Sequence, residues 1–201
     1  MTGGTRPTPG RPRSAAADKA ILAATLRLLS EQGYAGMSIE GVAAAAGVGK
    51  TTIYRRYTDK IDLVAAAIAS ILSDSGSPPD SGDAKADLIE FLRLNLTVFR
   101  QGAVYSIVGS LLVEEERNPE LFEIFRERAI FPRRRQLQEI LERGIQRGQL
   151  RSGVHLDAAI EALVGALYAR HISGLAETTE WLEGLVEVLW EGLSSQRRGA
   201  T

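Results

Sequence analysis

Proline is distributed in a way that strongly constrains what this chain can fold into. Of the seven prolines, three lie in the first twelve residues, two are adjacent at Pro78 and Pro79, and Pro119 and Pro132 stand alone. The three long stretches 13–77, 80–118 and 133–201 therefore contain none. Because a proline inside a helix costs about 3 kcal/mol, its absence leaves these stretches free to form long helices.

The spacing of the apolar residues favours helix over strand. In the last stretch, large apolar residues recur at helical intervals and glutamates occupy the positions between them. The apolar set is Leu182, Leu185, Val186, Leu189, Trp190 and Leu193. We find no comparable alternating run enriched in β-branched residues, which a strand would favour. We therefore predict an all-α fold.

Charge is divided unevenly along the chain. Over all 201 residues, 24 Lys and Arg nearly balance 25 Asp and Glu, for a net charge of −1. Residues 1–60 hold nine basic and four acidic residues, a net of +5, whereas residues 61–201 hold 15 and 21, a net of −6. This asymmetry predicts a basic module that faces nucleic acid, joined to an acidic module.

Rare residue types exclude several kinds of site. Without cysteine, the chain can form no disulfide, thiol nucleophile or Cys-ligated metal site, and its two histidines, His155 and His171, argue against a His-rich metal site. No apolar run approaches the ~20 residues that span a bilayer, and the N-terminus lacks the apolar segment of a secretory signal. No hydrolase or phosphate-loop motif is present. We expect a cytoplasmic protein with no cofactor, no membrane partner and no enzymatic activity.

Residues 15–60 have the pattern of a small helical DNA-binding unit. A first helix is predicted from Ala15 to Gly33, where glycine suits the backbone that ends a helix. A short second helix follows Ser38, then a tight turn at 47–49, then a third short helix over 50–57. Two short helices about a glycine turn are the elements of a helix-turn-helix.

The helix over 50–57 is the predicted recognition helix. Ile53 and Tyr57 lie four residues apart and are expected to face inward. Basic and hydroxyl side chains suit DNA, because Arg and Lys bind phosphate or guanine edges and Thr and Tyr donate hydrogen bonds. We expect such donors to face outward at Lys50, Thr51, Thr52, Tyr54, Arg55 and Arg56.

Residues 15–64 resemble the DNA-binding domain of the TetR family of transcription regulators. The resemblance rests on many spaced positions, which are Ala23 to Leu29, Gly33-Tyr34, Ser38-Ile39, Val42-Ala43, Ala46-Gly47-Val48, Thr52-Ile53-Tyr54, Tyr57, Asp59-Lys60 and Leu63. The chain departs from the family pattern at Gly49, Arg56 and Tyr57, where Ser, His and Phe are common. The glycine in place of serine puts one phosphate contact in doubt.

The resemblance implies a division of roles among these side chains. Arg55 and Lys60 would grip the DNA backbone, and Ser38 would cap the second helix, whose positive end can lie against a phosphate. For any single basic residue, the alternative is an ordinary solvated surface. The set that would face bases or their phosphates is Lys50, Thr51, Thr52, Tyr54 and Arg56.

The first 14 residues are predicted to form a flexible basic arm. Its Gly10-Arg11-Pro12 sequence is similar to the core of an AT-hook, and arginines in an extended arm can enter a narrow A·T minor groove. Arg11 and Arg13 are therefore candidate DNA contacts. The alternative is a disordered terminus, and an arm that orders only on DNA combines the two.

A linker is predicted between the basic and the acidic module. Residues 73–83 contain no large apolar side chain, so we expect a helix-turn-helix domain over 15–60, a connecting helix and linker over 61–82, and a ligand-binding and dimerisation domain over 83–201. Pro119 after Asn118 predicts a helix start. Pro132 removes the amide that would bond to the Arg128 carbonyl, so a kink or break is expected there.

Four segments of the acidic module form a recognisable pattern: Asn118-Pro-Glu-Leu121, Phe125-Arg-Glu-Arg128, Pro132-Arg-Arg-Arg135 and Leu141-Glu-Arg-Gly-Ile-Gln-Arg-Gly-Gln-Leu150. Through them, residues 85–193 resemble a common C-terminal domain of the same family, which implies a small-molecule pocket between the helices. For each candidate residue of this pocket, the alternative is ordinary packing in the core. A lone His such as His171 is more often a hydrogen-bonded core residue than a ligand contact. The basic run 133–135 is interpreted as a solvated face paired with Glu rather than as a second DNA site. The pocket candidates are Leu111 and eight aromatic or polar residues at otherwise apolar positions: Phe91, Asn95, Phe99, Tyr105, Phe122, Phe125, Tyr168 and His171.

The last two helices are predicted to form a dimer interface. Small residues recur along one face of residues 156–175, so another helix can approach closely, and the resemblance implies a four-helix interface between two copies. A C2 homodimer also places two recognition helices about 34–36 Å apart, the spacing of successive major grooves. The alternative is that these helices close the core of a monomer. The interface candidates are Ala162, Ala166, Ala169, Ser173, Leu185, Leu189 and Trp190.

These features together predict a function. We expect a repressor that binds a palindromic DNA operator as a homodimer and responds to a small-molecule effector. The alternative hypothesis is a ligand-binding or scaffold protein on the same fold that does not bind DNA.

Overall fold

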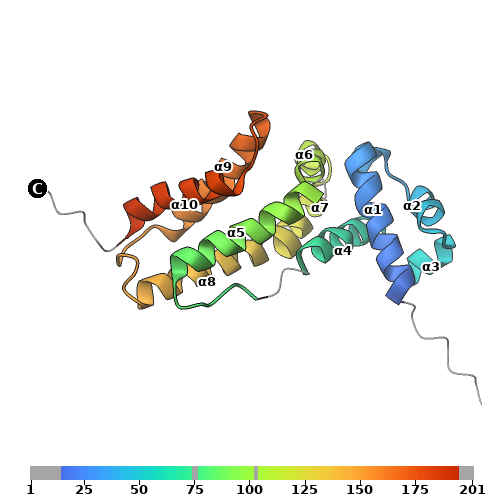
Figure 1. The fold of residues 1–201 in the computed structure, drawn as a ribbon. Coiled ribbons are helices and arrows are strands. Elements are labelled where there is room, and N and C mark those ends of the chain that lie inside the picture. Colours follow the sequence, from blue (N-terminus) through green and yellow to red (C-terminus); the bar gives the residue numbers. More distant parts are fainter. Residues whose placement is uncertain (1–14, 74–76, 102–103, 195–201) are drawn as a thin grey trace, which may run out of the picture.

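The computed structural model describes residues 15–73, 77–101 and 104–194. Within these ranges the long elements are all helices, which confirms the all-α prediction. Arg11 and Arg13 lie outside the described residues. The helices are arranged as an elongated body, with α1–α3 at one end and α9 and α10 toward the other (Figure 1).

The N-terminal half contains four helices. They are α1 (Ala15–Gly36), α2 (Ile39–Ala46), α3 (Lys50–Tyr54) and α4 (Lys60–Ser73). The first helix kinks at Gly33, whose φ of 69° is a conformation that glycine adopts without strain. The predicted end of the helix at Gly33 therefore corresponds to this kink, and a last turn continues to Gly36.

The C-terminal half contains the remaining helices. They are α5 (Ala84–Gln101), α6 (Val104–Glu114), α7 (Pro119–Phe125), η1 (Arg126–Ile130), α8 (Phe131–Gln146), α9 (Leu156–Ile172) and α10 (Thr179–Leu193). Helix α7 begins with proline in its first turn, as predicted. The element η1 is a π-helical turn just before Pro132, and it replaces the expected kink or break.

Two hydrophobic clusters hold the helices together. The first, which we call the head core, joins α1–α4 to residues of α6, α7 and η1, including Ile107, Leu111 and Phe122. The second, which we call the body core, joins α5, α8, α9 and α10. The first three helices therefore share a core with segments more than 50 residues further along the chain.

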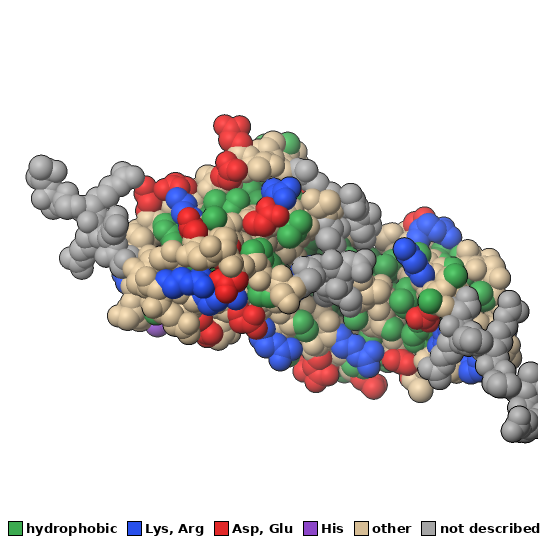
Figure 2. All heavy atoms as spheres, turned by 60° about the horizontal axis from the view of Figure 1, so that its bottom comes forward, with side chains coloured by type: hydrophobic (Ala, Val, Ile, Leu, Met, Phe, Trp, Pro, Cys, Tyr) green, Lys and Arg blue, Asp and Glu red, His purple; other side chains and the backbone are tan. Residues whose placement is uncertain are grey.

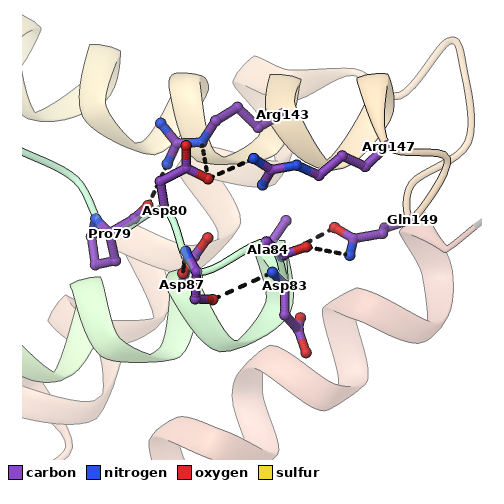
Figure 3. A network of polar contacts seen from close by, with 10 residues as sticks. Pro79, Asp80, Asp83, Ala84, Asp87, Arg143, Arg147 and Gln149 are labelled. Atoms are coloured by element: carbon purple, nitrogen blue, oxygen red, sulfur yellow. Dashed lines mark hydrogen bonds and ion pairs between the residues drawn. The ribbon is translucent and has the colours of Figure 1, made fainter.

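The linker before α5 is fastened to the end of α8 (Figure 3). Arg147 donates a 2.6 Å hydrogen bond to Asp80 Oδ1, and Arg143 donates to the carbonyl of Pro79. Gln149 accepts from the amide of Ala84 at 3.1 Å and donates to the carbonyl of Gly82 at 2.9 Å. The described part of the predicted linker, residues 77–83, is therefore non-helical, but hydrogen bonds at Pro79, Asp80 and Gly82 attach it to residues 143–149.

Candidate nucleic-acid interface and ligand cavity

The turn between α2 and α3 has the local geometry that the sequence predicted. The Ser38 hydroxyl accepts a 3.0 Å hydrogen bond from the amide of Gly41, which caps α2. Gly47 is left-handed, with a φ of 65°, and the Val48 amide donates to the carbonyl of Ala43 at 3.0 Å. Helix α3 then begins at Lys50, directly after this turn.

Helix α3 is shorter than predicted, because it ends at Tyr54 rather than Tyr57. The inward-facing pair is nevertheless confirmed, since Ile53 and Tyr57 are both buried in the head core. The Tyr57 hydroxyl donates a 2.8 Å hydrogen bond to Asp18 of α1. Burial and this contact both raise the pKa of Tyr57 above its ordinary value. Tyr57 therefore ties the end of the recognition segment to the first helix.

Most of the side chains expected to face outward do so. Lys50, Thr51, Tyr54 and Arg55 are exposed, and Thr52 is half-buried. Tyr54 retains 53% of its accessible surface, so its ring and hydroxyl are open to a partner. No ion pair among the described residues involves Arg55. This face of α3 presents hydroxyl and cationic donors to solvent.

Arg56 was predicted to face outward, and this was wrong. Its side chain is only 7% exposed, and its Nε lies 3.3 Å from Asp18 Oδ1. Its Nη1 also donates a 3.0 Å hydrogen bond to the carbonyl of Thr52. Because α3 ends at Tyr54, the chain turns before Arg56 and directs this side chain toward α1. Arg56 is a structural contact between α1 and the recognition segment.

Two lysines of the predicted interface have partners on the protein surface. Lys50 Nζ donates a 2.9 Å hydrogen bond to Glu40 Oε1 of α2, and this bond, together with the attraction of the two charges, raises the pKa of Lys50 and lowers that of Glu40. Lys60 lies over the Tyr34 ring, 4.2 Å from its centroid, and burial lowers the pKa of this lysine. Neither partner, Glu40 for Lys50 or Tyr34 for Lys60, was predicted from the sequence.

A cavity of about 270 Å³ lies in the C-terminal half. Its walls come from α4, α5, α6, η1, α8 and α9, with Phe125 at the end of α7. Five of the nine predicted pocket residues line it: Phe91, Asn95, Phe99, Phe125 and Tyr168. The Asn95 side chain is buried and donates a 2.6 Å hydrogen bond to the carbonyl of Phe91.

The other four predicted pocket residues do not line this cavity. Leu111 and Phe122 are buried in the head core, where they pack α6 and α7 against α1–α4. Tyr105 and His171 stack on each other with ring centroids 3.6 Å apart. His171 is half-exposed rather than in the core, and Tyr105 donates a 2.8 Å hydrogen bond to the buried Glu177. These four residues have packing roles outside the cavity.

Arg133 was interpreted as part of a solvated face, and the structure places it in the cavity wall. Its guanidinium carbon lies 5.7 Å from the centroid of the Phe91 ring, and burial lowers its pKa to about 10. The spacing contained a signal for this position, because Arg133 precedes Leu137, Ile140 and Leu141 on the buried stripe of α8. Arg134 also lines the cavity, but its predicted pairing with Glu is confirmed, since it lies 3.5 Å from Glu161 and 2.7 Å from Asp157.

The predicted dimer residues divide into two groups. On α9, Ala162, Ala169 and Ser173 are exposed and Ala166 is half-buried, beside an Ile172 that is 82% exposed. On α10, the three candidates Leu185, Leu189 and Trp190 are half-buried and pack against the body core of their own chain, while Val188 is exposed. The outer face of α9 is therefore small-residue-rich and apolar without a partner among the described residues.

The surface of the body carries charges of both signs. Figure 2 shows basic and acidic side chains interspersed along the face that it presents. Ion pairs among the described residues include Arg126–Glu115 and Arg134–Asp157. Among residues 15–73, 77–101 and 104–194, no helix combines the length and the apolar character needed to cross a membrane.

Comparison with known proteins places these features in a family. Residues 21–67 match the family model of bacterial regulatory proteins of the tetR family, and residues 78–189 match a tetracyclin repressor-like C-terminal domain. The chain is 36% identical over 169 residues to an uncharacterized HTH-type transcriptional regulator of Mycobacterium bovis, covering 84% of this chain and 80% of that one. It is 32% identical over 149 residues to the DNA-binding transcriptional repressor TetR of Mycobacteroides abscessus, covering 74% and 75%.

A solved structure has the same overall arrangement. The crystal structure of the TetR family transcription regulator SCO0332 aligns with a TM-score of 0.68 at 28% identity, covering 88% of this chain and 98% of that one. Three observations indicate the same family: the helix-turn-helix of α2 and α3, the two matched family models, and the similarity to this solved structure. The chain belongs to the TetR family and is a transcriptional regulator with a helix-turn-helix DNA-binding domain.

Proposed function

We propose that this regulator is a repressor that binds a palindromic operator as a homodimer and is released by a small-molecule effector. The observation that carries the ligand response is the position of the cavity. Part of its wall comes from α4 and α6, which pack on α1 of the DNA-binding end. Phe125, Ala129 and Ile130 of α7 and η1 also belong to the head core, and the remaining wall comes from α5, α8 and α9 of the body core. A ligand there touches both parts of the molecule.

The coupling works through differential affinity. A ligand shifts the equilibrium between two arrangements only if it binds one of them more tightly. Helix α6 is linked to α1 by a 2.9 Å hydrogen bond from the Ser106 hydroxyl to the carbonyl of Ser30. A ligand that moves α4 or α6 relative to the body core therefore moves α1, and with α1 the recognition helix.

The DNA contacts that we propose follow from exposure. Lys50, Thr51 and Tyr54 lie on the open face of α3 and reach base edges or their phosphates, with Thr52 at the margin. Arg55 is exposed beside them and grips the backbone. The Ser38 cap positions the N-terminus of α2 at a phosphate. Lys60 reaches the backbone only after leaving the ring of Tyr34.

The homodimer is supported by the unpartnered face of α9. Ala162, Ala169 and Ser173 are exposed, and so are the large apolar side chains of Ile172 and Leu175. Small residues let a second helix approach closely, and the exposed apolar atoms are removed from water when it does. We assign repression rather than activation because the relative from Mycobacteroides abscessus is named a repressor.

A mobility-shift experiment tests DNA binding and its specificity. We expect the purified protein to shift DNA from upstream of its own coding sequence more tightly than a shuffled duplex of equal length. Arg55→Ala should weaken binding to both duplexes and reduce the slope of log affinity against log salt by about 0.9, the value for one lost phosphate contact. Equal binding to both duplexes by the wild-type protein would contradict the proposal.

Sedimentation tests the homodimer. We expect the wild-type protein to sediment as a dimer and Ala169→Glu to sediment as a monomer, because the new carboxylate would be buried in the interface. Thr97→Glu introduces the same side chain on an exposed position of α5 and should leave the dimer intact. A monomeric wild-type protein at micromolar concentration, or equal effects of the two variants, would rule out this interface.

A further inference from the structure

The cavity between the head core and the body core combines apolar walls with one cationic side chain. Aliphatic and aromatic residues such as Phe91, Leu137 and Val164 form most of its surface. Its charged lining residues are Arg133, Arg134 and Glu161. Arg134 and Glu161 lie 3.5 Å apart and largely compensate each other's charge, and Arg134 also pairs with Asp157. The lining therefore carries a net positive charge, and Arg133 supplies it.

Arg133 occupies a position where a cation is costly. It lies on the buried stripe of α8, with its guanidinium near the face of Phe91 and with Nη1 donating a 3.3 Å hydrogen bond to Gln136. Removing a guanidinium from water costs free energy, and burial accordingly lowers the pKa of Arg133 to about 10. This value still leaves the side chain charged at neutral pH. An anion in the cavity would form an ion pair with this guanidinium, because opposite charges attract more strongly where water is excluded.

We propose that the cavity binds a small organic acid, with its acid group at Arg133 and its apolar body along α5 and α9. The planar guanidinium presents parallel N–H donors that match a carboxylate or a similar acid group. The apolar body would lie against Phe99 and Tyr168, whose rings meet edge to face with centroids 6.2 Å apart. An uncharged ligand of the same shape would make the apolar contacts but could not form an ion pair with Arg133.

The cavity also limits the size of the ligand. Its volume of about 270 Å³ lies just below the ~300–1,000 Å³ that is typical of sites for drug-sized molecules. A short alkyl chain or one or two rings fits this volume, whereas a large multi-ring compound does not. The class is therefore a compact amphipathic acid.

An acid at Arg133 lies next to the element that connects the cavity to the DNA-binding end. Ala129 and Ile130 of the π-helical turn η1 line the cavity just before Arg133. In the same turn, Arg128 lies 3.4 Å from Asp62 of α4, and α4 packs on α1. π-Helical turns often occur at functional sites because they add a residue that can be reorganised. The coupling from the cavity to the DNA-binding end rests on the proposed ligand response, whereas the binding of an acid at Arg133 does not.

Calorimetric titration of the full-length protein without DNA tests the inference. The probes are octanoate and 4-phenylbutanoate, each compared with its uncharged primary amide. We expect each acid to bind the wild-type protein at least tenfold more tightly than its amide, since a charge-assisted hydrogen bond is worth roughly this factor. Arg133→Met should remove that preference and leave amide binding unchanged. Arg133→Lys, which keeps the charge, should restore part of the preference.

Controls separate this result from loss of structure and from the proposed function. Arg135→Met removes an exposed arginine on the same helix and should change neither affinity, and circular dichroism establishes that each variant is folded. Equal binding of acid and amide, no binding of either acid, or an acid preference that survives in Arg133→Met would each overturn the inference. Operator release is measured separately by mobility shift. Acid binding that depends on Arg133 without operator release would support this site and contradict the proposed ligand response.

Discussion

The two hydrophobic cores of this protein are built from the sequence in different ways. The body core assembles α5, α8, α9 and α10 into a bundle within the C-terminal half. The head core instead combines α1–α4 with α6, α7 and η1, although Ile21 and Phe125 are separated by more than 100 residues. A domain boundary drawn along the chain near residue 60 or 82 therefore does not coincide with a boundary in packing.

Because the head core and the body core are separate, the position of the cavity between them matters for the proposed ligand response. Ile68, Ile107 and Ala129 bring the head core to its wall, and Phe91 and Leu167 bring the body core. A cavity inside one core would affect the stability of that core alone. When a ligand binds in a cavity where two cores meet, it can instead change the position of the head core relative to the body core.

The largest effect should come from emptying space in each core. Leu111→Ala in the head core and Leu141→Ala in the body core both remove a completely buried leucine, and each should lower the free energy of unfolding by about 2–5 kcal/mol. Chemical denaturation measures this loss. Only Leu111→Ala should also weaken operator binding by the folded protein, because α6 packs directly on α1.

The comparison of these two leucine variants tests whether packing of α6 in the head core determines the position of the DNA-binding helices. Operator affinity is measured for both variants at a temperature where each is more than nine-tenths folded, a condition set by about 1.4 kcal/mol of remaining stability. Unchanged affinity in Leu111→Ala would mean that the DNA-binding helices act independently of α6. Reduced affinity in Leu141→Ala alone would reverse the assignment of the two cores.

The next largest effect concerns the adjacent arginines at the DNA-binding end. Arg56→Ala should lower the free energy of unfolding by about 1–3 kcal/mol, because it removes hydrogen-bonding partners of Asp18 and of the Thr52 carbonyl. Arg55→Ala should leave unfolding unchanged and weaken DNA binding. Urea denaturation and mobility shift distinguish the two. A stability loss at Arg55 or none at Arg56 would contradict the placement of these side chains.

Much of the DNA-binding end was predictable because its signals are local. The Ser38 cap, the left-handed Gly47 and the inward pair of Ile53 and Tyr57 follow from spacing and from backbone preferences of single residues. Arg56 was not predictable in this way. Its burial depends on the end of α3 at Tyr54 and on Asp18, which lies 38 residues earlier in the chain.

The cavity was harder to predict because its wall is assembled from seven elements, α4 to α9 and η1. Aromatic residues on helix faces indicated Phe91, Phe99 and Tyr168 correctly. The same reasoning also selected Leu111 and Phe122, since periodicity reports that a residue is buried but not which core it enters. Arg133 was dismissed by residue type, although its register on α8 placed it with the buried leucines.

A smaller effect should appear at the ion pair between α2 and α3. Glu40 lies beside the proposed DNA surface and holds Lys50 at 2.9 Å. Glu40→Gln should strengthen DNA binding several-fold at low salt, because it releases Lys50 and removes a negative charge that faces phosphate. Glu31→Gln is the control, since Glu31 pairs with Arg27 on α1, away from α3. Weaker binding by Glu40→Gln would show that the pair positions Lys50 for DNA instead of competing for it.

The smallest effect is expected at the body end, where Asp80 fastens the linker to α8. The hydrogen bond from Arg147, with the charges of Arg147 and Arg143, holds the pKa of Asp80 below its usual range. The unfolded chain has a pKa near the ordinary ~3.9, so the paired carboxylate contributes stability above that pH. This contribution is lost as the pH falls through the lower, folded-state value.

Asp80→Asn isolates this contribution from that of the other carboxylates. The free energy of unfolding of the wild-type protein should exceed that of the variant by a small, constant amount between about pH 5 and 8. The difference should begin to shrink below about pH 4 and vanish once the pH lies below the lowered, folded-state pKa of Asp80. Added salt should reduce the difference, since the pair is exposed to solvent. Operator binding should be the same in both proteins, because Asp80 lies in the linker against the body core, whereas Arg56 ties the head core to α3. Weaker operator binding by Asp80→Asn would therefore show that the linker takes part in placing the two cores, and that the body end is coupled to DNA more tightly than its packing indicates.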